Sequence, residues 1–215
     1  MKPTTIFFAL TLIFLSTKPS QSSRSIFDDT VVYDASGNPL EKDATYFISP
    51  PIWGPLGGRV MLSSALGYNQ TCAADVLQSP FEVAPGTPFT FTPVSPLQED
   101  AIKLGYPVAI QSPTENPCEE GSTVWKVSTR IGVYAEIITT GGTINTPDSC
   151  IRITRPRDPL FPYSYALEYC PFMCGAGFKI CKPIGIYTSN HKAHLSPSGS
   201  SFEIVFLKAS GSAAI

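Results

Sequence analysis

The chain has 215 residues, of which 43% are hydrophobic and 15% are charged. This balance is typical of a folded globular protein and excludes a chain that stays disordered in solution. The net charge is −2, from 15 basic and 17 acidic side chains, and the basic residues are scattered, which argues against nucleic acid as a partner. With 21 prolines and 16 glycines we expect short elements separated by many turns, in one all-β domain.

The first residues have the organisation of a secretory signal peptide. A charged start at Lys2 leads into the apolar stretch Ile6 to Leu15, and the small, polar stretch Ser16 to Ser23 follows. We therefore predict a signal peptide over residues 1–23 and one domain over residues 24–215. A buried N-terminal strand or helix is the alternative. No later apolar run is long enough for a membrane anchor, so we expect a secreted protein, extracellular or apoplastic, with the vacuole as another destination.

Segments rich in β-branched and aromatic residues recur along the chain, separated by turns. They are Thr30 to Tyr33, Thr45 to Ile48, Arg59 to Leu62, Asp75 to Gln78, Phe89 to Phe91, Val108 to Gln111, Val124 to Ser128, Val133 to Ile138, Cys150 to Thr154, Tyr165 to Tyr169, Ile184 to Tyr187 and Phe202 to Leu207. Short strands at such spacing predict a barrel or a sandwich. The twelve segments divide into three groups of four, near residues 28–90, 91–148 and 149–208, although no sequence repeat proves a threefold structure.

Three arginines, Arg152, Arg155 and Arg157, alternate with other residues near the end of one predicted strand. The alternation indicates the outer face and end of that strand. We interpret them as a solvated edge, with an anion site as the alternative.

Six cysteines occur, and this even number behind a signal peptide predicts a disulfide framework. They are Cys72, Cys118, Cys150, Cys170, Cys174 and Cys181. The last three, together with His191 and His194, match no common zinc spacing, so we expect no metal and no cofactor. Asn69-Gln70-Thr71 is a sequon for N-glycosylation at Asn69.

Further motifs follow the leader along the whole chain: Val32 to Leu40 with its Gly-Asn-Pro-Leu turn, Thr45 to Ile48, Cys72 to Gln78, Trp125 to Val127, Tyr165 to Pro171, Gly185 to Tyr187, His194-Leu195 and Phe202 to Phe206. These motifs resemble the Kunitz soybean-trypsin-inhibitor family of plants, and the C-terminal part is most similar to its miraculin-like branch. This resemblance covers nearly all of the chain after the leader. It implies a β-trefoil, which is a six-stranded barrel capped by three hairpins, with twelve strands and pseudo-threefold symmetry.

The resemblance also implies a pairing for the cysteines. Carried over by position, the family's two bridges join Cys72 to Cys118 and Cys170 to Cys181. Cys150 and Cys174 then remain, and we expect them to pair with each other. A free or intermolecular pair is the alternative.

Members of this family inhibit proteases through an exposed, substrate-like loop, and the resemblance places that loop at Pro93, Val94, Ser95, Pro96 and Leu97. Ser95 would take the primary specificity position, where a trypsin inhibitor needs Lys or Arg to meet an acidic pocket. Pro96 restricts Ser95 and has no N–H. Lys42 stands where strong inhibitors of the family have a loop-bracing Asn. Lys103 is an alternative anchor residue. A further alternative is that Pro93 to Gly105 form an ordinary solvent-exposed loop that has no function in binding.

We therefore predict a protease inhibitor, monomeric and not a strong trypsin inhibitor, whose target is a cysteine, aspartic or non-tryptic serine protease. The alternative is a binding or storage trefoil for a sugar, a pigment or a receptor surface. Four aromatic residues could form such a surface or belong to the core: Trp53, Phe161, Tyr163 and Tyr165. An enzyme is the weakest interpretation, because no nucleophile or carboxylate motif accompanies His191 and His194, which lie in a turn-rich segment.

Overall fold

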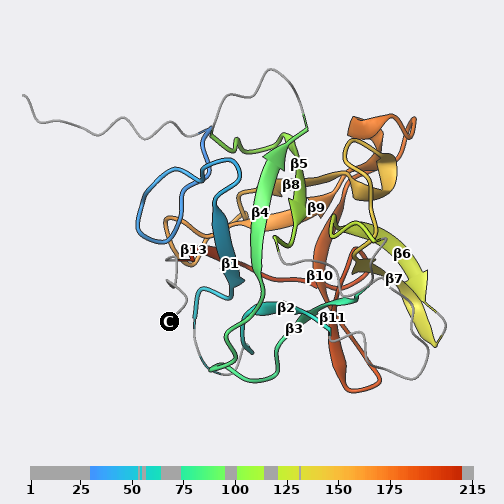
Figure 1. Ribbon diagram of the computed structural model, residues 1–215, viewed down its shortest axis with the longest axis horizontal. Coiled ribbons are helices and arrows are strands. Elements are labelled where there is room, and N and C mark those ends of the chain that lie inside the picture. The colour runs from blue at the N-terminus through green and yellow to red at the C-terminus, as the bar shows by residue number, and fades with distance from the viewer. Residues whose placement is uncertain are drawn as a thin grey trace, which may run out of the picture.

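The computed structural model describes residues 30–52, 54, 57–63, 74–94, 101–113, 121–130 and 132–209. The described residues form thirteen β-strands and two short 3-10 helices (Figure 1). The strands are β1 (Thr45–Ser49), β2 (Val60–Leu62), β3 (Val76–Gln78), β4 (Pro88–Pro93), β5 (Pro107–Gln111), β6 (Lys126–Arg130), β7 (Val133–Thr139), β8 (Ile151–Thr154), β9 (Ala166–Tyr169), β10 (Lys182–Ser189), β11 (Lys192–Ser196), β12 (Ser200–Ser201) and β13 (Val205–Lys208), and the helices are η1 (Pro147–Ser149) and η2 (Pro171–Cys174). Within this described part, neither helix has the length or apolar character needed to cross a membrane.

Six strands form a closed barrel. Antiparallel pairing runs from β13 to β1, β4, β5, β8 and β9 in turn, and β1, β4 and β5 stand side by side in Figure 1. A bridge between Tyr165, just before β9, and Ile204, just before β13, completes the circle. Its two backbone hydrogen bonds measure 2.8 and 2.9 Å. Closure satisfies the backbone groups that the edges of an open sheet would expose.

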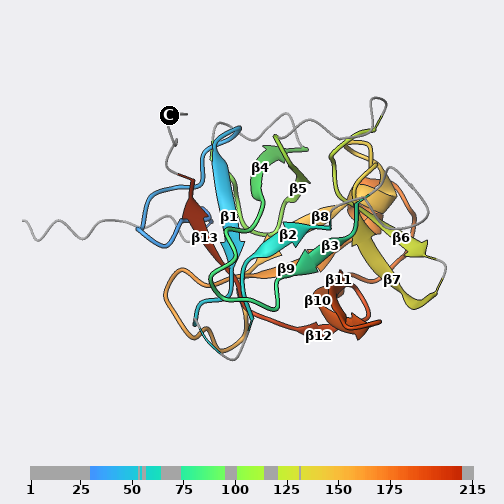
Figure 2. The ribbon, with the colours of Figure 1, turned by 60° about the horizontal axis from the view of Figure 1, so that its bottom comes forward.

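Three hairpins lie at one end of this barrel (Figure 2). They consist of β2 with β3, β6 with β7, and β10 with β11. β3 also pairs with β11, and a bridge from Asp75 to Thr139 joins β3 to β7, so the hairpins contact one another. A six-stranded barrel with three such hairpins is a β-trefoil, as the sequence predicted.

The structure also has three groups of strands, but their limits differ from the predicted ones, since β8 closes the second group although the predicted third group began near residue 149. Strands β1 to β4 cover Thr45 to Pro93, β5 to β8 cover Pro107 to Thr154, and β9 to β13 cover Ala166 to Lys208. The third group contains one strand more than the others. The additional strand is β12, which pairs with β10. The described residues therefore form three successive groups of strands, two of four and one of five, without a readable sequence repeat.

The barrel is filled by aromatic and branched side chains. Its largest fully buried residues include Trp125, Tyr46, Tyr165, Phe89, Phe91 and Phe206. Phe89 meets Trp125 edge to face with ring centroids 4.9 Å apart, and Phe91 meets Phe206 in the same way at 5.1 Å. Such pairs contribute about 0.5 to 1.5 kcal/mol each beyond the area they bury. The core therefore links strands from all three groups.

One predicted strand is absent, and two observed strands were not predicted. The segment Thr30 to Tyr33 is not a strand: Val31 forms only an isolated bridge with Lys103, and Tyr33 one with Pro39. Conversely, β11 and β12 were not predicted. β11 contains the buried His194 and Leu195, but its neighbours are rich in Ser, Gly and Pro, which weaken a strand pattern.

The three arginines do not form the edge of a sheet. β8 has neighbours on both sides, β5 and β9, so the expected solvated edge is wrong, although Arg152 does point to the outer face. Arg152 forms an ion pair of 2.6 Å with Glu168 on β9. Arg155 donates to the Pro162 carbonyl oxygen at 2.8 Å, and Arg157 is exposed.

Candidate functional site

The candidate loop begins where β4 ends. Pro93, the last residue of β4, is paired with Val108 of β5. One residue further on, the Val94 N–H donates to the Pro107 carbonyl oxygen at 3.1 Å. Pro93 and Val94 are half-buried, and together they form the outgoing base of the loop. Ser95, Pro96 and Leu97 lie outside the described residues.

The returning side of the loop is held by two separate segments of the N-terminal region. Ile102 is buried, donates from its N–H to the Leu40 carbonyl oxygen at 3.0 Å and accepts from the Val32 N–H at 2.9 Å. The Leu104 N–H donates to the Thr30 carbonyl oxygen at 2.7 Å. Both ends of the loop are therefore fixed in the fold, which limits the entropy lost when such a loop binds a partner.

Lys42 lies in the exposed turn between Leu40 and β1. The next residue, Asp43, has a positive φ of 62°, a conformation in which Asp is enriched. Its Oδ1 accepts a hydrogen bond of 3.4 Å from the hydroxyl of Thr92, near the end of β4. Asp43 was not predicted as a site residue. Its position directly after Lys42 is the one feature of the sequence that could have drawn attention to it.

The same turn is fastened to the last strand. Lys208 of β13 forms an ion pair of 2.9 Å with Glu41, and this hydrogen bond raises the pKa of Lys208. The Glu41 N–H donates to the hydroxyl of the buried Tyr46 at 3.0 Å. The turn next to the loop base is thus connected to both β1 and β13.

Lys103, the alternative anchor, belongs to the returning segment. It is half-buried and forms a backbone bridge with Val31. A residue whose backbone is already paired within its own fold presents less of that backbone to a protease. This pairing argues against Lys103 as the anchor.

The two histidines lie in different environments. His191 is exposed in the turn between β10 and β11. His194 is buried in β11, and its Nδ1 lies 3.8 Å from Oδ2 of Asp75. The expectation that both lie in a turn-rich segment is wrong for His194, because its side chain packs inward opposite β3.

The aromatic residues considered as a binding surface also differ from one another in burial. Tyr165 is fully buried and its hydroxyl accepts from the Tyr33 N–H at 2.8 Å. Tyr163 packs partly against the core, with its ring 5.8 Å from that of Tyr33. Phe161 is 44% exposed, and Trp53 lies outside the described residues. Tyr165 therefore belongs to the core and not to a surface for ligands.

Two disulfides occur within the described residues. Cys150 is joined to Cys174 and Cys170 to Cys181, as the sequence analysis expected for these four cysteines. Cys72, Cys118 and Asn69 lie outside the described residues.

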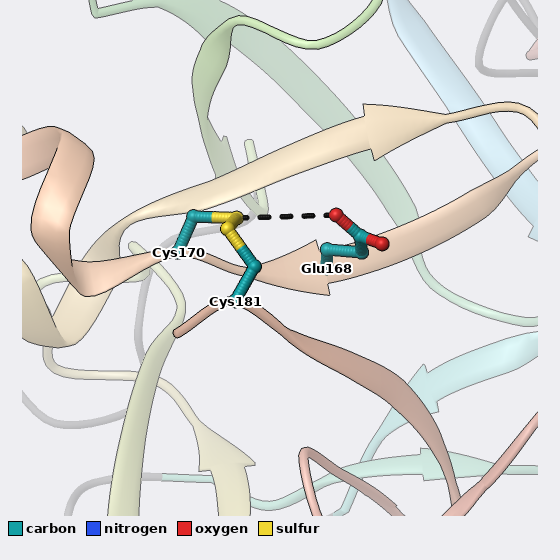
Figure 3. Close-up of side chains that lie close together, drawn as sticks. All are labelled: Glu168, Cys170 and Cys181. Carbon is teal, nitrogen blue, oxygen red and sulfur yellow. Dashed lines mark hydrogen bonds between the residues drawn. A yellow bond between two sulfur atoms is a disulfide. The ribbon is translucent and has the colours of Figure 1, made fainter. Parts of the chain in front are cut away.

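A carboxylate lies beside one of these disulfides. Figure 3 shows Glu168 close to Cys170 and Cys181, with an oxygen of Glu168 4.0 Å from Sγ of Cys170. The bonded sulfurs are not thiolates and therefore lack the charge with which cysteine binds a metal. The carboxylate itself accepts a hydrogen bond of 2.8 Å from Nε of Arg152. The ion pair joins β9 to β8, and the disulfide joins the end of β9 to the start of β10.

Comparison with known proteins agrees with this geometry. A family model described as trypsin and protease inhibitor, Kunitz_legume, matches residues 32–208. The chain is 28% identical over 201 residues to aspartic protease inhibitor 1 of Solanum tuberosum, covering 86% of this chain and 87% of the relative. It is 30% identical over 202 residues to subtilisin inhibitor CLSI-II of Canavalia lineata, covering 85% and 94%.

A comparison of structures gives the same result. The solved structure of the Kunitz-type cysteine protease inhibitor PCPI-3 from potato matches with a TM-score of 0.69 and 26% identity, covering 84% of this chain and 97% of the other. The chain therefore belongs to the Kunitz family of plant protease inhibitors, whose members bind proteases.

Proposed function

We propose that this chain is a secreted protease inhibitor that acts through the loop between β4 and β5, with Pro93 to Leu97 as the segment that enters the protease. The observation that carries the proposal is the attachment of both loop ends. The outgoing end is bonded to β5 through Val94, and the returning end to the N-terminal segment through Ile102. A loop held in this way loses little freedom on binding.

The residue at the primary specificity position indicates which proteases are targets. Ser95 has no positive charge for the acidic pocket of trypsin, and Pro96 has no N–H to offer. The similar proteins include inhibitors named for aspartic proteases, subtilisin and cysteine proteases. The proposed target is thus a cysteine, aspartic or non-tryptic serine protease. The protein is proposed to act as a monomer without a cofactor, after removal of residues 1–23, with residues 24–215 as its single domain.

A panel of proteases tests this proposal. Purified protein comprising residues 24–215 is incubated with trypsin, chymotrypsin, subtilisin, papain and pepsin, and the inhibition constant is measured for each. We expect inhibition of at least one enzyme other than trypsin, and a substitution of Val94→Asp should weaken it, since it places a charge at the base of the loop. Absence of inhibition of all five enzymes at micromolar protein would overturn the proposal.

A further inference from the structure

A second loop projects from the molecule beyond η2. It comprises Gly175 to Ile180 and is called here the stapled loop; η2 and this loop are part of the orange segment at the upper right of Figure 1. The disulfide between Cys170 and Cys181 encloses η2 and the loop, with a sequence separation of 11. The disulfide between Cys174 and Cys150 joins the last residue of η2 to the residue before β8. Both ends of the stapled loop are thus covalently attached to the barrel.

The tip of the stapled loop is a tight turn centred on Phe178. The Lys179 N–H donates to the Gly177 carbonyl oxygen at 2.9 Å, which closes a three-residue turn. Gly177 has a φ of 68°, which glycine adopts without steric cost. The turn places the Phe178 ring outward, where it is fully exposed at 112% of its reference area.

Phe178 is not a single apolar residue on a polar surface. Ile180 is 88% exposed and Phe172 of η2 is 46% exposed, so three large apolar side chains are exposed within nine residues of chain. The one charged side chain among them is Lys179, and no acidic residue occurs between Glu168 and Glu203. Scattered exposed apolar side chains need no explanation, but three in one short stapled segment indicate an interaction site.

We propose that the stapled loop is a second protease-binding loop, and that Phe178 enters the specificity pocket of a chymotrypsin-like serine protease. That pocket is a hydrophobic slot, which accepts an aromatic ring presented at the tip of a turn. The neighbouring residues Gly175, Ala176 and Gly177 are small and let an enzyme approach the backbone closely. The inference rests on the proposed function only in taking a protease as partner, because it uses a different loop.

The disulfide also determines what happens if the protease cleaves the loop. Hydrolysis would add one water across the bond between the Phe178 carbonyl carbon and the Lys179 nitrogen, which leaves a carboxylate and an ammonium group. Because Cys170 and Cys181 lie on opposite sides of this bond, the two fragments stay joined. The cleaved ends remain near each other, so that the loop continues to occupy the enzyme and is not released as product.

The inference is tested with chymotrypsin and the protein comprising residues 24–215. The variant Phe178→Ala is compared with wild type and with Phe81→Ala, a matched control whose ring is 70% exposed in the turn before β4. We expect Phe178→Ala to raise the inhibition constant by about 100-fold, as for an anchor residue of an interface, and Phe81→Ala to leave it unchanged. After long incubation, mass spectrometry should show a gain of one water, with two fragments separating only after reduction.

Three results would overturn this inference. The first is equal inhibition of chymotrypsin by wild type and Phe178→Ala, and the second is no inhibition by wild type at micromolar concentration. The third is binding to vesicles of phosphatidylcholine and phosphatidylserine that Phe178→Ala abolishes, since the loop would then serve a membrane surface. The Val94→Asp variant separates the two proposals. If this variant still inhibits chymotrypsin, the proposal for the stapled loop is supported even when the loop between β4 and β5 binds no protease.

Discussion

Asp34 determines the conformation of the turn that precedes the loop brace. Its carboxylate is buried, and Oδ1 accepts hydrogen bonds of 2.9 Å from the N–H groups of both Ser36 and Asn38. This turn leads directly to Leu40, whose carbonyl oxygen holds Ile102 on the returning side of the candidate loop. One side chain therefore connects the N-terminal turn to the base of the site.

Replacing Asp34 tests this connection. We expect Asp34→Ala to lower the free energy of unfolding by about 2 to 3 kcal/mol, because two backbone donors lose a charged acceptor. Asp34→Asn keeps an acceptor oxygen and should lose less. Urea denaturation of the three proteins checks this, and equal stability of Asp34→Ala and wild type would contradict it.

Tyr165 has a comparable role inside the barrel. Its hydroxyl accepts from the Tyr33 N–H at 2.8 Å, and the residue is fully buried. Tyr165→Phe should therefore lower the free energy of unfolding by about 1 to 3 kcal/mol, since the amide loses this acceptor. Tyr134→Phe, at a side chain 97% exposed, should change stability by less than about 0.5 kcal/mol. Equal losses of stability in the two variants, measured by thermal denaturation, would contradict a stabilising role for the Tyr165 hydroxyl.

Among the elements, η2 is attached through Cys174 to Cys150, the residue before β8, while the disulfide from Cys170 to Cys181 joins the end of β9 to the start of β10. The double variant Cys150→Ala/Cys174→Ala removes a closure with a sequence separation of 24. The expected loss of stability is about 3 kcal/mol, measured by chemical denaturation against the intact protein. A loss below about 1 kcal/mol would indicate that packing alone holds η2 in place.

β1 is an element that the sequence predicted correctly from an alternating pattern. Tyr46 and Ile48 of β1 are buried and Phe47 between them is not, as expected of a strand with one face on a core. β11 was missed because its strand character comes from pairing with β3 and β10, and not from its composition. The Thr30 to Tyr33 segment shows the reverse case, since its residues favour a strand but it has only isolated bridges.

Only part of the candidate site could be predicted from the sequence. The family resemblance placed the loop at Pro93 to Leu97 and its brace position at Lys42, and both assignments stay predictions. It did not locate the contact between Asp43 and Thr92 or the attachment of Ile102 to Val32 and Leu40. Such contacts join segments that are far apart along the chain, so no local pattern of residues shows them.

At the scale of the whole molecule, buried tyrosines make the fold sensitive to high pH. Burial raises the pKa of Tyr46, Tyr165 and Tyr169 above the usual value of 10.0. In the unfolded chain these hydroxyls ionise at the usual pKa, whereas the native state keeps its protons to higher pH. Their contribution to stability is therefore complete below about pH 10 and is lost as the pH rises through the folded-state pKa values.

Thermal denaturation as a function of pH measures this effect. We expect the melting temperature to fall above about pH 10 as the tyrosines of the unfolded state ionise. The fall should be smaller in Tyr165→Phe, which has one buried hydroxyl fewer. A melting temperature that stays constant up to about pH 12 would contradict the role of these groups.

The closed barrel holds both ends of the loop between β4 and β5, and we propose that this loop determines which protease is bound. The most direct measurement is the inhibition constant for trypsin of the double variant Ser95→Arg/Pro96→Ile, compared with wild type. The variant supplies the positive charge that the trypsin pocket requires and restores the missing N–H. We predict a gain in affinity of about 100-fold or more. No gain in a variant that folds as stably as wild type would contradict the assignment of this loop as the protease-binding site.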